Sequence, residues 1–317
     1  MNLTSSRTLN EVFSPSRARR RYEVWFLRMG LADGSGAWWL RYLLMNPGRG
    51  GCDEKTLGAP IQVWATHFPV GNRPQSYIQG FRSNGLDLSS RAQQPFWFAV
   101  GGNEMGENSC RGRLQVDGHD VSWNLRYTSN FRTTISHKGW IGFSQTPHSD
   151  AIFEGEITLD GHMVRGNPLG YGLQGHNCGY RHRNFWTWTH AFFPRPGKPP
   201  STLEALEYDM PLGLRFRKAV LWHDGTEHVF RDLKETKRDA QSLQWEFQGA
   251  TASSELKVAI DGKGVEVHSL PYLKTNCSGT FEVRNNSLAR ARVDLRLAGH
   301  SSETLETKGG AVLEMAG

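Results

Sequence analysis

The 317-residue chain has little cysteine, and its four cysteines stand far apart, at Cys52, Cys110, Cys178 and Cys277. No two of them form a CxxC pair, so their spacing indicates neither a zinc site nor a disulfide framework. Histidines gather in the middle of the chain, at His119, His162, His176, His182 and His190. No HxH or HxxxH pair occurs among them, and carboxylates at suitable spacing are absent. We therefore expect no metal site.

Long apolar runs are also absent. Nowhere do about 18 apolar residues follow one another, which is the length that a membrane-spanning helix needs. The opening MNLTSSRTLNEVF has no apolar core long enough for a signal peptide. The chain also lacks a GxSxG motif, which excludes the usual serine-hydrolase nucleophile turn. These absences favour a cytoplasmic protein of a reducing compartment.

The net charge of +6 owes much to one run near the amino terminus, Arg17, Arg19, Arg20 and Arg21. Elsewhere the basic residues are scattered and accompany no nucleic-acid-binding motif, so we expect no nucleic acid partner. The run fits a solvated leader to the first strand, or a transient contact with an anionic membrane surface. No protein partner is evident.

Tryptophan and glycine, by contrast, are abundant, with 11 and 35 residues. Apolar and aromatic residues alternate with polar ones in short runs, and five Asp-Gly dipeptides stand at the ends of such runs or between them. This pattern is typical of antiparallel strands joined by tight turns. No segment has a helical period. The sequence therefore predicts an all-β protein.

The length favours two domains. Four prolines in the segment 194–200 cannot continue a sheet interior, so we expect the boundary there. The predicted domains are residues 1–196 and 197–317. About nine or ten strands in each part match closed antiparallel barrels, which have no exposed sheet edge. Two consecutive barrels with a ligand-sized interior are the predicted architecture.

The segment 170–193, GYGLQGHNCGYRHRNFWTWTHAFF, is the most unusual in the chain. In a strand, Trp186, Trp188, His190 and Phe192 would share one face, because alternate side chains point the same way. Such a face is either a packed core or the wall of a binding site. If it is buried, His190 needs a polar partner. Before this strand, His176 and Asn177 lie among glycines, in an expected loop.

A first hairpin is predicted from residues 22–29 and 37–45, with Asp33 and Gly34 in its turn. Charged side chains inside a strand normally face water, and we expect this of Arg28 and Arg41. Glu23 stands beside Tyr22 and close to Trp25, so both a solvent-facing and a functional position remain open for it.

These segments resemble a known family. GYGLQGHNCG (170–179) resembles the Gly-Tyr…His-Asn-Trp-Gly signature of tocopherol cyclases and carotenoid 1,2-hydratases, a group that includes attachment-protein-like proteins. The hairpin at 22–44 is similar to the group's Glu-x-Trp hairpin, and 272–286 fits its second half loosely. Cys178 stands where the family usually has tryptophan. The resemblance implies two lipocalin-like barrels, and chemistry on hydrophobic isoprenoid-like molecules without metal or organic cofactor.

Hydration or ring closure of an alkene begins with protonation to a carbocation. The candidate acids are Glu23, His176 and His190, and Glu23 is favoured because a carboxylic acid with a raised pKa is the stronger proton donor. Electron-rich rings stabilise a cation by about 0.5–2 kcal/mol each. The candidate rings are those of Trp25, Trp38, Trp186 and Trp188. Tyr171 and Asn177 can orient the acid or the substrate, or serve packing and a turn.

We therefore predict a cofactor-independent cyclase or hydratase. Its substrate would be a hydrophobic, unsaturated molecule of isoprenoid, polyene or polyketide type, bound in the first barrel or between the barrels. Two alternatives remain open. A carrier would hold an apolar ligand without chemistry, and a pericyclase would use the same pocket without a strong acid.

Overall fold

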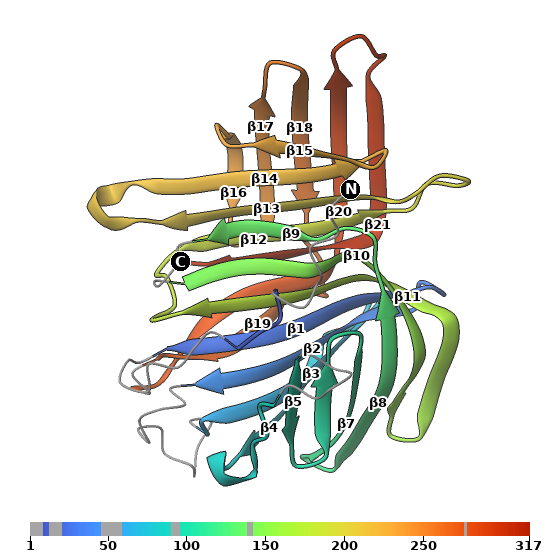
Figure 1. Ribbon diagram of the computed structural model, residues 1–317, viewed down its shortest axis with the longest axis vertical. Helices are drawn as coiled ribbons and strands as arrows, with labels where there is room; N and C mark the ends of the chain where they lie inside the picture. The colour runs from blue at the N-terminus through green and yellow to red at the C-terminus, as the bar shows by residue number, and fades with distance from the viewer. Residues whose placement is uncertain (1–8, 13–20, 46–58, 90–95, 138–141, 276–277) are drawn as a thin grey trace.

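The computed structural model describes residues 9–12, 21–45, 59–89, 96–137, 142–275 and 278–317. In these residues the chain is all β, apart from two 3-10 turns, η2 (Ser83–Gly85) and η3 (Pro211–Gly213). The strands form two large antiparallel sheets, one above the other in Figure 1. The all-β prediction is confirmed. Within the described ranges, no helix has the length and apolar character needed to cross a membrane.

The first sheet contains eleven strands in the order β4-β3-β2-β1-β11-β10-β8-β7-β6-β5, with β9 paired to β10. Their bounds are β1 (Tyr22–Leu31), β2 (Gly36–Met45), β3 (Ile61–Pro69), β4 (Gln75–Phe81), β5 (Trp97–Val100), β6 (Asn103–Gly106), β7 (Ser109–Val116), β8 (His119–Thr128), β9 (Thr133–His137), β10 (Gly142–Leu159) and β11 (His162–Gly179).

The second sheet contains ten strands in the order β15-β14-β13-β12-β21-β20-β18-β17-β16, with β19 paired to β20. Their bounds are β12 (Trp186–Phe193), β13 (Ser201–Asp209), β14 (Arg215–His223), β15 (Thr226–Phe230), β16 (Lys234–Asp239), β17 (Gln244–Ala250), β18 (Ser254–Asp261), β19 (His268–Leu273), β20 (Thr280–Leu297) and β21 (Glu303–Ala316).

The chain passes from the first sheet to the second between Gly179 and Trp186, upstream of the proline-rich segment at which we expected the domains to divide. The tryptophan-rich strand β12 therefore belongs to the second sheet, where it pairs with β13 and β21. The prolines of 194–200 lie in the loop between β12 and β13.

The ladders of both sheets have ends in the part of the chain that the structure describes. The first ends at β4 and β5, and the second at β15 and β16. One bridge joins the segment after β4 to β5, with paired backbone hydrogen bonds of 2.9 and 2.8 Å between Asp87 and Ala99. The described residues thus form two large antiparallel sheets, and closure of either sheet into a barrel is not detected in them.

Three Asp-Gly pairs form the tight turns expected of them. Asp117-Gly118, Asp160-Gly161 and Asp224-Gly225 have positive φ at both residues and join β7 to β8, β10 to β11, and β14 to β15. This backbone is that of a type I′ turn, whose twist matches that of the two strands.

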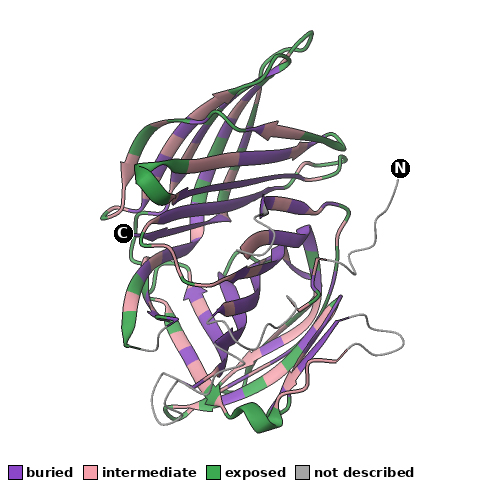
Figure 2. Ribbon diagram, turned by 60° about the vertical axis from the view of Figure 1, so that its left-hand side comes forward, coloured by how far each residue is buried: buried purple, intermediate pink, exposed green. Residues whose placement is uncertain are grey.

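Buried side chains form three clusters. Trp25 and Tyr42 belong to a core that side chains of the first sheet form, and Trp245 belongs to a core that side chains of the second sheet form. The third cluster lies between the sheets and takes side chains such as Phe26 and Trp188 from both. Figure 2 shows buried residues concentrated where the sheets meet. Because successive side chains of a strand point to opposite faces, β1 contributes side chains to two of these cores.

Arg28 extends from β1 into this interface and is completely buried. Its guanidinium donates hydrogen bonds to the carbonyls of Ser287, Gly309, Gly310 and Ala311 in the second sheet, with distances of 2.6 Å to Gly309 and 3.2 Å to Gly310 and Ala311. Burial lowers the pKa of Arg28 to about 9, so it is charged at neutral pH. The expectation that it faces water was wrong, because the second sheet covers this face of β1.

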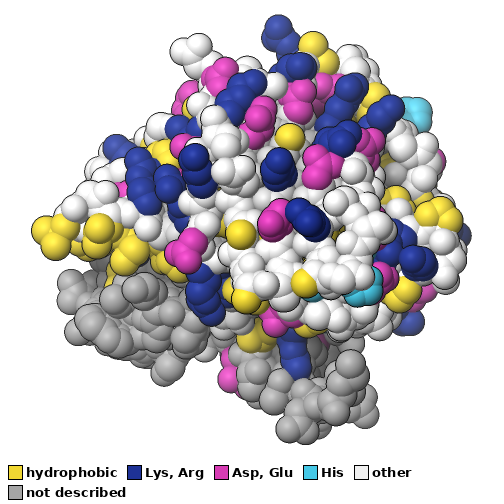
Figure 3. All heavy atoms as spheres, turned by 90° about the horizontal axis from the view of Figure 1, so that it is seen from above, with side chains coloured by type: hydrophobic (Ala, Val, Ile, Leu, Met, Phe, Trp, Pro, Cys, Tyr) yellow, Lys and Arg dark blue, Asp and Glu magenta, His cyan; other side chains and the backbone are white. Residues whose placement is uncertain are grey.

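The outer surface of the second sheet carries charges of both signs. Seen from above, Lys and Arg side chains alternate with Asp and Glu, so neither sign dominates this face (Figure 3). Of the predicted basic run, Arg17, Arg19 and Arg20 lie outside the described residues. Arg21 is buried, with a guanidinium nitrogen 3.6 Å from a carboxylate oxygen of Glu23.

Candidate functional site

The structure brings three of the predicted site residues together inside the first sheet. Glu23 and Trp25 lie on β1, and His176 lies opposite Trp25 on β11. Glu23 Oε1 is 3.0 Å from His176 Nε2, and both side chains are completely buried. The Trp25 indole stacks on the imidazole at a centroid distance of 4.6 Å. The segment around His176 is part of the continuous strand β11 and not the loop that we expected.

A short amino-terminal segment covers this pair. His176 Nδ1 donates to the Leu9 carbonyl at 2.6 Å, and Trp25 Nε1 donates to the Asn10 carbonyl at 3.1 Å. Since Nδ1 carries a proton, the contact with Glu23 requires a second proton, either on Nε2 or on the carboxyl group. Together the two side chains therefore hold one proton more than an ionised carboxylate and a neutral histidine would hold.

His190 is not part of this cluster. It lies on β12 in the other sheet, where Nε2 donates to the Ser149 carbonyl at 2.8 Å. Burial lowers the pKa of His190 to about 3, so the ring is neutral. The predicted faces of β12 are confirmed: Trp186 and Trp188 lie with the cluster between the sheets, whereas Ala191 lies with the core of the second sheet.

A cavity of about 390 Å³ lies between the sheets, at the end of the interface where β12 begins and β13 ends. Its walls are largely aromatic, with Phe26 and Trp39 from the first sheet and Trp186, Trp188 and Tyr208 from the second. Polar and charged side chains also line it, so the cavity combines aromatic rings with polar groups, as sites for small molecules do.

Glu314, on β21, is one of these polar groups and is buried. Trp186 Nε1 donates to one carboxyl oxygen at 2.9 Å, and the Tyr272 hydroxyl contacts the other at 2.7 Å. Burial raises the pKa of Glu314, whereas the charge of Arg41 opposes this change. The hydrogen bonds from Tyr272 and Trp186 oppose it as well, but burial has the larger effect, so the cavity contains a carboxyl group with a raised pKa.

Arg41, on β2, faces the same cavity and is buried, contrary to the expectation that it faces water. Its guanidinium carbon lies 4.1 Å from the ring centroid of Tyr272, 4.6 Å from that of Trp64 and 5.9 Å from that of Trp39. Aromatic faces therefore replace water around this cation. As with Arg28, the second sheet covers the face of the strand on which Arg41 lies.

The loop between β11 and β12 contributes Arg181, His182 and Arg183 to the cavity. The His182 ring stacks on Tyr22 at a centroid distance of 4.0 Å. Burial, with Arg41 nearby, lowers the pKa of His182 to about 3. His182 is therefore neutral at physiological pH.

The predicted binding residues are divided among three places. Asn177, Trp186 and Trp188 line the cavity between the sheets. Trp38 lies inside the first sheet, as Trp25 does, and stacks on His67. Tyr171 stacks on Phe192 and lines a second cleft, of about 600 Å³, at the opposite end of the interface.

Sequence reasoning missed Arg41, His182, Tyr272 and Glu314 as site residues. Glu314 lies in an apolar segment, AVLEMA, that was not recognised as a strand. A single glutamate inside such an apolar run was the available signal, because a charged residue there is either at a surface or in a polar site.

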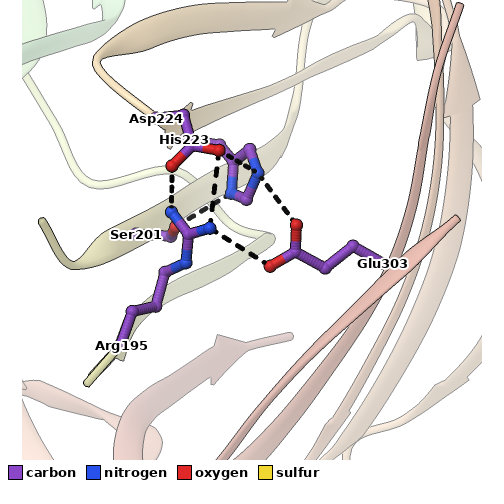
Figure 4. A network of polar contacts seen from close by, with 5 residues as sticks. All are labelled: Arg195, Ser201, His223, Asp224 and Glu303. Atoms are coloured by element: carbon purple, nitrogen blue, oxygen red, sulfur yellow. Dashed lines mark hydrogen bonds and ion pairs between the residues drawn. The ribbon is translucent and has the colours of Figure 1, made fainter. Parts of the chain in front are cut away.

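One other polar cluster lies away from this cavity. Ligand atoms of His223, Asp224 and Glu303 lie within 4.8 Å of one another, the one such group of possible metal ligands in the described residues. Figure 4 shows that Arg195 extends between the two carboxylates. Its guanidinium supplies the positive charge there and links the loop after β12 to the turn after β14 and to β21.

No family model and no curated protein matches this sequence. Several solved structures are similar to it, including the following two. Kievitone hydratase from Nectria haematococca has a TM-score of 0.56 and 11% identity, over 99% of this chain and 95% of that chain. An AttH-type protein from Nitrosomonas europaea has a TM-score of 0.52 and 12% identity, over 95% of this chain and 93% of that chain. The resemblance predicted from the sequence is confirmed at the level of the fold.

Proposed function

We propose that this protein is a hydratase, or a cyclase that begins with the same protonation, and that it acts on a hydrophobic unsaturated molecule in the cavity between the sheets. The observation that carries the proposal is Glu314, a buried carboxyl group with a raised pKa in a cavity walled by aromatic rings. In this proposal each sheet is a lipocalin-like barrel, and the substrate lies between the two barrels.

The reaction begins when the Glu314 carboxyl group gives its proton to one carbon of the alkene. The other carbon becomes a carbocation, beside the rings of Trp186, Trp188 or Trp39. A water molecule then adds through its oxygen and returns a proton to the Glu314 carboxylate, so that the net change is addition of water. In a cyclase, a hydroxyl oxygen of the substrate replaces the water.

In this proposal Glu314 is the general acid, whereas the sequence favoured Glu23 for that role. Glu23 and His176 lie outside this cavity and under the amino-terminal segment, and His190 donates to a backbone carbonyl. The fold likeness to kievitone hydratase supports a hydratase, although a shared fold by itself does not assign a reaction. The indole and hydroxyl groups beside Glu314 fix the position of its carboxyl group, and their donated hydrogen bonds limit the rise of its pKa.

The test is incubation with a panel of prenylated phenols, linear isoprenoids and polyenes in water enriched in oxygen-18, followed by mass spectrometry. A hydratase adds one labelled water, and a cyclase forms a product of unchanged mass. Glu314→Gln should lower turnover at least about 100-fold, because it removes the general acid. The dissociation constant should change by no more than about threefold, because the amide keeps the size of the side chain and one hydrogen-bond acceptor.

Two variants serve as controls. Glu306→Gln changes an exposed glutamate on the same strand and should leave turnover unchanged. Glu23→Gln tests the acid that the sequence favoured. If Glu314→Gln kept full turnover and Glu23→Gln lost it, the general acid would be Glu23, in the core of the first sheet. Binding of panel members by the wild type without any conversion would show a carrier.

A further inference from the structure

Arg41 is a buried cation with an unused hydrogen-bond donor. Its Nη1 is buried and has no hydrogen-bond partner, and the side chain is 5% exposed. Glu314 is close enough to interact with it electrostatically, but no ion pair of Arg41 is found in the part of the chain that the structure describes. The contacts that surround it are the faces of Tyr272, Trp64 and Trp39.

Such an arrangement costs free energy in the empty protein. Leaving a buried donor unpaired costs about 1–3 kcal/mol, and more when the group is charged. Cation–π contacts offset part of this cost but supply no hydrogen-bond acceptor. A ligand oxygen with a negative charge would supply both the acceptor and the opposite charge.

Arg28 provides the contrast within the same interface. It is also completely buried, but it donates to four backbone carbonyls and so needs no ligand. Arg183 lines the cavity but is half-buried, so its charge is partly solvated. Arg41 therefore stands out, because it combines burial, a place in the cavity wall and an unpaired donor.

We infer that Arg41 anchors an anionic oxygen head group of the substrate, either a carboxylate or the ionised oxygen of an acidic phenol or enol. The substrate is then amphipathic, with its head group against Arg41 and its unsaturated chain against Trp186 and Trp188. Asn177 supplies a second contact, since it lines the cavity and its buried Oδ1 has no hydrogen-bond partner, so that it can accept from a ligand hydroxyl.

The inference rests on the cavity of the proposed function, but not on its reaction. The two are also connected. A negative head group beside Arg41 screens Glu314 from the positive charge that opposes its protonation. Binding of the anion therefore favours the protonated acid that the proposed reaction needs.

The test compares two probes that differ only at the head group, farnesoate and farnesol, by quenching of tryptophan fluorescence near neutral pH. The wild-type protein should bind farnesoate at least about tenfold more tightly, as expected for a hydrogen bond to a charged group. Arg41→Met should abolish this preference while farnesol binding changes by no more than about threefold. Arg41→Lys keeps the charge and should retain part of the preference.

Arg183→Met is the matched control, because it removes a cation from the same cavity and should keep the preference. Equal binding of both probes by the wild type would overturn the inference and leave the proposed reaction untouched. A preference lost in Arg183→Met but kept in Arg41→Met would overturn it as well. Failure of the wild type to bind either probe, or any member of the panel above, would instead argue against the cavity as a site for apolar molecules.

Discussion

At the scale of single residues, burial between the sheets shifts the pKa values of Glu204 and His190 toward their uncharged forms. Glu204 and His190 lie opposite each other on β13 and β12. Burial raises the pKa of Glu204 to about 7 and lowers the pKa of His190 to about 3. Trp188 and Thr146 donate to the two carboxyl oxygens of Glu204 at 3.0 and 2.8 Å, so both oxygens keep a partner.

Glu204 should make the protein less stable as the pH rises. Between its ordinary pKa and about 7, the unfolded chain loses this proton while the folded protein keeps it, so the free energy of unfolding falls. The fall is limited to about 3 kcal/mol by the size of the pKa change. Glu204→Gln keeps an acceptor and should remove this part of the pH dependence.

Urea denaturation of wild type and Glu204→Gln, from about pH 4 to about pH 8, measures the difference. His190 has the opposite effect, since its lowered pKa costs stability as the pH falls below its ordinary value, and this contribution is common to both proteins. Free energies of unfolding that run parallel over the whole range would contradict the assignment.

At the scale of elements, β11 shows how a glycine-rich motif can be misinterpreted. The glycines of 170–179 suggested a loop, but they permit close packing inside a strand. A Cβ atom at Gly172 would lie 1.8 Å from the backbone oxygen of Arg28, and one at Gly175 would lie 2.3 Å from the Phe26 ring. Glycine lets another backbone approach closely, and the sequence alone does not say whether this happens in a turn or in a sheet.

Gly172→Ala should therefore destabilise the protein by at least about 1–3 kcal/mol, because a methyl group there meets backbone and not a movable side chain. Thermal unfolding followed by circular dichroism measures this change. Gly85→Ala is the control, since a Cβ there meets nothing within 4 Å. Equal melting temperatures for the two variants would show that β1 and β11 can separate without cost.

The sequence predicted local features well and contacts between the sheets poorly. Alternation along β12 correctly placed Trp186 and Trp188 on one face, because this pattern depends only on strand geometry. It could not show that the second sheet covers the outer face of β1 and β2. The positions of Arg28, Arg41 and Glu314 depend on that contact, so two were assigned to solvent and one was overlooked.

The whole molecule is held together by contacts that join residues distant in the sequence. Arg28 on β1 donates to carbonyls near β20 and β21, and Thr146 on β10 donates to Glu204 on β13. The cavity likewise takes walls from both sheets, so neither sheet has a complete site.

The Arg28 contacts have a consequence for protein engineering. Two polypeptides divided between Gly179 and Trp186, and produced together in one cell, should reassemble, because the guanidinium recognises a fixed set of carbonyls on the other piece. Copurification through a tag on one fragment measures this. Arg28→Met should abolish recovery of the untagged fragment, whereas exchange of the exposed Arg292 for Met should not. If a ligand of the cavity increased copurification, the divided protein would report the binding of that ligand.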